Sequence, residues 1–118
     1  MLSEVCISSL AKINIGLKVL PKRDDGFHNI ESIFQTVDIA DELKVTLSEG
    51  NSRCKVSCDS LRLPTENTIT MAYNAFCTVT GMELPSVNVE LTKRIPSGGG
   101  LGGGSSNAAA LVRALQII

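Results

Sequence analysis

The feature that most limits the fold of this chain is a cluster of glycines close to its C-terminal end. Residues 95–110 are Ile-Pro-Ser-Gly-Gly-Gly-Leu-Gly-Gly-Gly-Ser-Ser-Asn-Ala-Ala-Ala, so six of the ten glycines fall within seven positions. Glycine has no Cβ, and its backbone can therefore turn sharply and lie close to a bulky ligand. Because proline and glycine interrupt regular structure, we expect this run to be a loop between two elements.

The segments on either side of this loop have clear periodicities. Val87, Val89 and Leu91 alternate with polar residues and predict a strand. After the loop, Ser105 or Ser106 is expected to cap a helix. The apolar face of that helix is expected to consist of Ala108, Leu111, Val112, Leu115 and Ile118. A strand, a glycine loop and a helix in this order suit phosphate, because the loop N–H groups and the positive end of the helix dipole both attract anions.

The N-terminal half of the chain mostly predicts strands. Alternating or β-branched segments predict strands over residues 4–9, 13–20, 30–38, 42–48 and 53–58. A charged loop is expected over residues 21–26 and a turn over residues 49–52. Within residues 13–20 the alternation would place Ile13, Ile15, Leu17 and Val19 on one face of the strand.

A further helix is predicted between the strands and the final strand–loop–helix unit. Thr65 or Asn67 is expected to cap it, and it should run to about Val79 and stop at Gly81. Its apolar face is expected to be Ile69, Ala72, Tyr73, Phe76 and Val79. The sequence of elements predicts a single α+β domain, as the length of 118 residues also favours.

Charge and cysteine content exclude several classes of function. The net charge of −1 disfavours nucleic acid and membrane surfaces as partners, because their binders usually carry a basic excess. Cys54 and Cys58 have no second convincing pair and the chain has one histidine, so no metal site is expected. No signal peptide or membrane span is recognisable, and free thiols in a reducing, cytoplasmic compartment are expected.

Known phosphate loops differ from the glycine cluster in identifiable ways. Gly98, Gly100 and Gly103 satisfy G-x-G-x-x-G, but a dinucleotide fold needs that loop early in a βαβ unit, with an acid about twenty residues later. The NTPase loop needs a lysine that is absent here, and the protein-kinase loop joins two strands. A flexible linker remains an alternative, although linkers rarely carry an embedded leucine such as Leu101.

The pattern from Pro96 to Ala108 resembles the central ATP-binding motif of the GHMP kinase superfamily. Two earlier segments are similar to the branch that phosphorylates 4-diphosphocytidyl-2-C-methyl-D-erythritol. These are Ala11-Lys12-Ile13-Asn14-Ile15 and the segment Arg23-x-Asp25-Gly26-Phe27-His28, and Asp38 and Asp41 also fit the pattern of that branch. The resemblance covers nearly the whole chain. It implies the α+β fold of a GHMP N-terminal domain, which is similar to domain 2 of ribosomal protein S5.

The resemblance also implies a reaction and a set of roles. ATP, with Mg²⁺, would phosphorylate the 2-hydroxyl of the substrate in non-mevalonate isoprenoid (terpenoid) biosynthesis. Lys12 would be catalytic, and Asn14 would hydrogen-bond nearby. Phe27 would stack on cytosine and His28 would bind its edge. The ATP-binding residues would be Asn67, Lys93, Pro96, Gly98, Gly99, Gly100, Leu101, Gly102, Gly103, Gly104, Ser105 and Ser106. For Lys93 and Asn67, a surface lysine and a helix cap are nearly equal alternatives.

The chain departs from the family pattern in one essential respect. The catalytic aspartate of the family follows in a Gly-Ala-Asp segment, and this sequence contains no such segment. The last helix also ends on Ile117-Ile118 without a stop signal. We therefore expect residues 1–118 to be a truncated N-terminal domain, without its C-terminal domain and with little or no activity alone. The alternatives are another GHMP kinase of homoserine or mevalonate type, a non-catalytic nucleotide-binding module, and an S5-like RNA-binding domain that the net charge disfavours.

Overall fold

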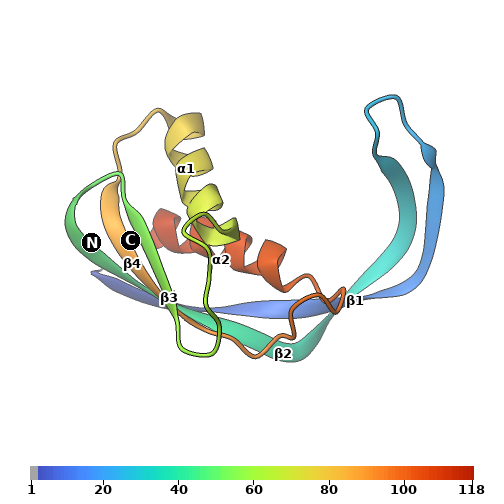
Figure 1. The fold of residues 1–118 in the computed structure, drawn as a ribbon, viewed down its shortest axis with the longest axis horizontal. Coiled ribbons are helices and arrows are strands. Elements are labelled where there is room, and N and C mark those ends of the chain that lie inside the picture. The colour runs from blue at the N-terminus through green and yellow to red at the C-terminus, as the bar shows by residue number, and fades with distance from the viewer. Residues whose placement is uncertain (1–2) are drawn as a thin grey trace.

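A four-stranded mixed sheet carries two helices on one of its faces (Figure 1). The computed structural model describes residues 3–118. Its strands are β1 (Glu4–Lys22), β2 (His28–Asn51), β3 (Cys54–Cys58) and β4 (Pro85–Thr92), and its helices are α1 (Thr68–Thr80) and α2 (Gly103–Ile117). The strand order is β1-β2-β4-β3, in which only the β3–β4 pair is parallel. The α+β prediction is confirmed.

The hydrophobic core lies between the helices and the central strands. The predicted inward side chains of β4, Val87, Val89 and Leu91, are buried, as are Leu43 and Val45 of β2. The helices contribute Ile69, Tyr73, Ala110, Leu111 and Ala114 to the same core. The alternation of Val87, Val89 and Leu91 in the sequence therefore identified the core-facing residues of β4 correctly. Among residues 3–118 no helix is long and apolar enough to cross a membrane.

Helix α1 begins and ends where the sequence predicts. The side chain of Asn67 accepts hydrogen bonds from the backbone N–H groups of Ile69 and Thr70, at 3.0 and 3.1 Å. Gly81 ends the helix with a positive φ of 64°, a conformation that glycine adopts without strain. The predicted apolar face is wrong at Val79, which is 85% exposed, because the last turn of the helix extends beyond the sheet.

Helix α2 begins earlier than predicted. The cap is Gly102, with a φ of 71°, and neither Ser105 nor Ser106 caps the helix because both lie inside its first turns. The buried stripe also differs from the predicted face, since Ala110 and Ala114 are buried beside Leu111. The remaining members of the predicted face, Ala108, Val112, Leu115 and Ile118, are half-buried along its edges.

The two long strands form a hairpin that extends well beyond the helices (Figure 1). Predicted strands 4–9 and 13–20 are parts of β1, whereas 30–38 and 42–48 are parts of β2. The predicted turn at 49–52 is mostly strand, because β2 continues to Asn51 before the backbone turns at Ser52. We call residues 13–34, which form the outer part of the hairpin, the arm.

A bulge in the arm overturns the predicted single apolar face of β1. Ile15 pairs with Ile33, but Leu17 pairs with the adjacent Ser32, so Gly16 is an extra residue in β1. Gly16 has a φ of 69°, and its carbonyl accepts a hydrogen bond of 2.7 Å from the Ser32 hydroxyl. Consecutive residues of β2 point to opposite faces. Leu17 therefore lies on the face opposite to Ile15, together with Val19.

Candidate functional site

The glycine loop borders a cavity of about 550 Å³ beside the start of α2. The opposite wall is the segment that leads into α1, with Leu61, Leu63 and Asn67. The cavity lining contains almost all of the residues that the sequence predicts to bind ATP. These are Asn67, Lys93, Pro96, Gly98, Gly99, Gly100, Leu101, Gly102, Gly103, Gly104 and Ser105. Ser106, the remaining predicted residue, is half-buried and does not line it.

The loop backbone alternates between two conformations. Gly98, Gly100 and Gly102 have φ values of 76°, 73° and 71°, whereas the intervening Gly99 and Leu101 do not have positive φ. A backbone that alternates in this way turns successive N–H groups toward one concave side, which is the usual geometry of an anion-binding nest. The positive φ thus accounts for glycine at three positions of the loop, Gly98, Gly100 and Gly102.

The start of α2 adds further free donors to the same cavity. No side chain caps Gly102, and the first helical hydrogen bond runs from the Ser106 N–H to the Gly102 carbonyl at 2.9 Å. The N–H groups of residues 103–105 precede this bond and have no helical acceptor. All three residues line the cavity. The loop and the helix together therefore present a series of donors suited to phosphate oxygens.

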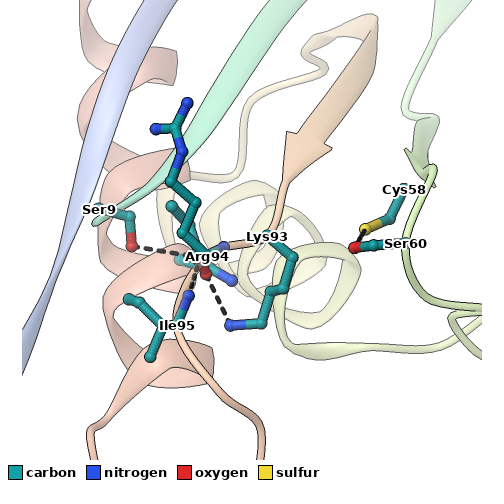
Figure 2. Close-up of polar contacts among 8 residues, drawn as sticks. Ser9, Cys58, Ser60, Lys93, Arg94 and Ile95 are labelled. Atoms are coloured by element: carbon teal, nitrogen blue, oxygen red, sulfur yellow. Dashed lines mark hydrogen bonds and ion pairs between the residues drawn. The ribbon is translucent and has the colours of Figure 1, made fainter. Parts of the chain in front are cut away.

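Lys93 is held in the cavity wall by a buried carboxylate (Figure 2). Its Nζ lies 2.7 Å from Oδ2 of Asp41, and its side chain is 13% exposed. The other oxygen of Asp41 accepts hydrogen bonds from the backbone N–H groups of Arg94 and Ile95, at 2.6 and 2.8 Å. Burial alone would raise the pKa of Asp41, but the donors from Ile95, Lys93 and Arg94 outweigh it and lower the pKa.

Lys12 lies against the glycine loop from the side of β1. Its Nζ donates to the carbonyl oxygen of Gly100 at 3.0 Å and to Oδ1 of Asn14 at 3.4 Å. The same ammonium lies 5.3 Å from the centre of the Phe34 ring, within range of a cation–π interaction. The structure therefore brings Lys12 and Asn14 together beside the loop, although neither lines the cavity.

Phe27 and His28 lie at the far end of the arm, apart from the glycine loop (Figure 1). Phe27 is 69% exposed. Nδ1 of His28 lies 2.7 Å from the carbonyl oxygen of Leu20, which can only accept, so Nδ1 carries a proton. In the neutral ring Nε2 is then an acceptor. The structure does not bring these two residues into contact with the loop.

Comparison with known proteins identifies the family. Residues 67–118 match the family model described as the GHMP kinases N terminal domain. A 4-diphosphocytidyl-2-C-methyl-D-erythritol kinase of Treponema pallidum is 46% identical over 108 residues, which are 92% of this chain and 37% of that protein. An enzyme of the same name from Fusobacterium nucleatum is 40% identical over 117 residues, which are 98% of this chain and 40% of that protein. The chain belongs to the GHMP kinase family.

Two solved kinase structures share the fold described above. The crystal structure of a 4-(cytidine 5'-diphospho)-2C-methyl-D-erythritol kinase matches 96% of this chain and 40% of that protein, with a TM-score of 0.78 and 34% identity. Homoserine kinase from Cytophaga hutchinsonii matches 98% of this chain and 36% of that protein, with a TM-score of 0.71 and 23% identity, which supports the fold alone. The chain thus spans about two-fifths of the length of the relatives it matches.

Two buried polar groups of this GHMP kinase domain were not assigned a role from the sequence. Asp41 is fully buried, and Asn107 lines the cavity and accepts a hydrogen bond of 2.7 Å from the buried Ser9 hydroxyl. One signal was available for Asp41, which precedes Leu43 and Val45 at steps of two residues and therefore points toward the same core face. For Asn107 we find no comparable signal.

Proposed function

We propose that the longer protein containing this chain transfers a phosphoryl group from ATP to the 2-hydroxyl of 4-diphosphocytidyl-2-C-methyl-D-erythritol. In this proposal residues 1–118 form the ATP-binding N-terminal domain, and the rest of the longer protein supplies a second domain. The observation that carries the proposal is the alternating glycine backbone that runs into the uncapped start of α2 at the cavity. The identity to kinases of that name favours this substrate.

The phosphate-binding groups would be the loop N–H groups and the first turn of α2. Phosphoryl transfer requires little covalent chemistry from the protein, so positioning and neutralisation of charge dominate catalysis. The Lys12 ammonium lies beside Gly100 and could stabilise charge that develops on the transferred group, while Asn14 holds the ammonium in place. Lys93, which lines the cavity beside Gly103, would also neutralise phosphate charge.

Mg²⁺ is part of the proposal because it balances the charge of ATP in phosphoryl transfer. Among the described residues that line the cavity there is no carboxylate, and the exposed Ser105 provides a hydroxyl oxygen. This donor set fits an ion that phosphate oxygens and water hold in large part, as Mg²⁺ usually is. Ser105 would be the protein ligand in this part of the chain.

The exposed ring of Phe27 and the Nε2 of His28 would form the cytosine site. An aromatic ring offers a stacking surface, and an unprotonated ring nitrogen can accept a hydrogen bond from an exocyclic amino group. The separation of the arm end from the loop favours a long substrate, with a base at one end and the reacting hydroxyl at the other. The proposal also includes small-molecule partners and a cytoplasmic location, and it includes no nucleic-acid or membrane partner.

The proposal is tested by measuring ADP release by the longer protein with each of three alcohols. We expect turnover with the cytidine diphosphate-linked substrate and little with homoserine or mevalonate. Lys12→Ala should lower kcat by about a hundredfold if its charge stabilises the transition state. Preference for homoserine or mevalonate would overturn the substrate assignment.

The isolated chain distinguishes an enzyme domain from a simple binding module. We expect the 118 residues alone to bind ATP but to turn over little or no substrate, because the Gly-Ala-Asp segment is absent from them. Turnover close to that of the longer protein would contradict this expectation. ATP binding by a longer protein that phosphorylates none of the three alcohols would favour a non-catalytic module.

A further inference from the structure

Asp41 is the only acidic side chain among the buried residues of the described chain, and it lies at the point where β4 leads into the glycine loop. It sits opposite Ser9 in the sheet and has no exposed surface. A buried carboxylate is costly unless charged or polar donors satisfy its oxygens. Asp41 has three such donors, and all of them come from the consecutive residues 93–95. A single side chain therefore fixes the whole segment from which the loop starts.

The Lys93 side chain has little freedom where Asp41 holds it. A Cβ atom on Gly103 would lie 2.8 Å from Nζ of Lys93, so the ammonium lies directly against the first residue of α2. Lys93 also lines the cavity, as does Gly103. The ammonium has three donors, of which Asp41 takes one. The other two remain for a ligand in the cavity.

The negative charge of Asp41 stabilises the Lys93 ammonium at the start of α2. The first turn of α2 is the positive end of a helix dipole, and a lysine ammonium beside it is repelled. The carboxylate balances that repulsion, so that Lys93 can occupy its place before any anion arrives. A binding site that is arranged in advance loses less free energy on association than one that must be ordered by its ligand.

We propose that Asp41 is a positioning residue for nucleotide phosphate, which holds the Lys93 ammonium beside Gly103 and fixes the backbone at the start of the glycine loop. The proposal rests on the assignment of this cavity to ATP. Asp41 acts through Lys93 and the N–H groups of residues 94 and 95, and it does not itself touch the ligand.

The test compares ligand affinities of variants of the 118-residue chain, measured by amide chemical-shift titration. Asp41→Asn keeps an oxygen for the two backbone N–H groups but removes the charge that holds Lys93. We expect it to weaken ATP and inorganic triphosphate about tenfold, with adenosine affinity changed less than about twofold. The matched control is Asp38→Asn, the same change at an exposed position of β2, which should alter none of the three affinities.

A double variant separates positioning from simple stabilisation of the fold. If Asp41 acts through Lys93, the variant Asp41→Asn/Lys93→Met should bind ATP no more weakly than Lys93→Met alone. If the double variant lost ATP affinity by the product of the two single-variant factors, the proposal would be wrong. An equal loss for ATP and adenosine in Asp41→Asn would also overturn it, because a general loss of structure affects both ligands.

A pH titration followed by NMR tests the proposal if Asp41→Asn folds poorly or if the wild-type chain binds no ATP. In the wild-type chain, the side-chain resonances of Lys93 and the amide resonances of Arg94 and Ile95 should follow one pH titration, that of Asp41. In Lys93→Met the two amides should still share one titration, but at higher pH than in the wild type, because Lys93 no longer lowers the pKa of Asp41. Absence of that shared titration would overturn the proposal, and its presence would support it. If the shared titration were present but the chain bound no ATP, the proposed function would be contradicted, whereas the positioning role of Asp41 would not.

Discussion

The backbone N–H of Lys12 donates a hydrogen bond to the carbonyl oxygen of Leu101 at 2.9 Å, which ties the middle of β1 to the middle of the glycine loop. The Lys12 side chain then continues along the loop to the carbonyl of Gly100. On the way it packs on Gly102, where an added Cβ would lie 3.0 Å from Cε and 3.2 Å from Cγ of Lys12. Strand and loop are therefore in contact through both the backbone and the side chain of Lys12, from Gly100 to Gly102.

The first prediction uses two glycines of the loop that have similar φ but different neighbours. Gly98→Ala should cost about 1 kcal/mol of unfolding free energy, because φ is 76° there but no atom lies within 4 Å of the new Cβ. Gly102→Ala has a similar φ and also meets Lys12, so it should cost more and weaken ATP binding about tenfold. Urea unfolding and ATP titration of both variants measure the difference. Equal effects would contradict a tight contact between Lys12 and the loop.

The second prediction concerns the first turn of α2. Neither Gly103 nor Gly104 has a positive φ, and alanine is the better helix former by about 1 kcal/mol. A Cβ on Gly104 meets Thr68 at an ordinary 3.4 Å, whereas one on Gly103 lies 2.8 Å from Lys93 Nζ and 3.1 Å from Ile95 Cγ2. Gly104→Ala should therefore be neutral or stabilising in thermal unfolding. Gly103→Ala should displace the ammonium from Asp41 and weaken the binding of inorganic triphosphate.

If both alanine variants bound triphosphate as the wild type does, Lys93 would not be confined by Gly103. If both variants lost triphosphate binding equally, the cause would be the reduced backbone flexibility of the first helical turn. The contact with Lys93 would then not explain the loss. The pair thus reports on the Lys93 position without changing any charge.

The sequence was sufficient for features that depend on neighbouring residues. The alternation of Val87, Val89 and Leu91 depends on a two-residue period, and the Asn67 cap and Gly81 stop depend on local backbone chemistry. These predictions are confirmed because each signal and its effect lie within one element. The prediction of a phosphate-binding loop has the same local basis, together with a resemblance that three separate segments carry, and it stays a prediction.

The predictions that failed depended on partners elsewhere in the chain. Leu17 and Val19 change faces because Gly16 is an extra residue opposite β2, and no periodicity within β1 reveals that pairing. Helix α2 starts at Gly103, directly after Gly102 adopts a positive φ beside Lys12, a residue far away in the sequence. The role of Asp41 likewise depends on residues 93–95, which only the folded sheet brings beside it.

The third prediction tests the contact between α1 and the strand that follows it. The hydroxyl of the buried Tyr73 donates to the carbonyl oxygen of Pro85 at 2.9 Å. Tyr73→Phe removes the donor and leaves that carbonyl without this partner, which should lower the unfolding free energy by about 1–2 kcal/mol. The control Val79→Ala changes an exposed side chain of the same helix and should alter it little. A Tyr73→Phe variant as stable as the wild type in urea would contradict a net stabilising contribution from this hydrogen bond.

The fourth prediction is a loss of stability at alkaline pH. Burial, with a smaller contribution from the charge of Cys77, raises the pKa of Cys54 from 9.0 to about 11. The folded state therefore keeps a proton that the unfolded state releases between these values, so the unfolding free energy should fall as pH rises from about 9 to about 11. Below pH 9 both states are protonated, and Cys54 should contribute no pH dependence.

Urea unfolding under reducing conditions at pH 8, 9, 10 and 11 measures this slope. Cys54→Ala removes the buried thiol and should flatten the decline between pH 9 and 11, whereas Cys6→Ala removes an exposed thiol and should leave it unchanged. Burial also raises the pKa of Tyr73 to about 12, so a second decline should begin above pH 10 and should disappear in Tyr73→Phe. Equal slopes in the wild type and Cys54→Ala would mean that the thiol ionises in the folded chain as readily as in the unfolded one, which would contradict its burial.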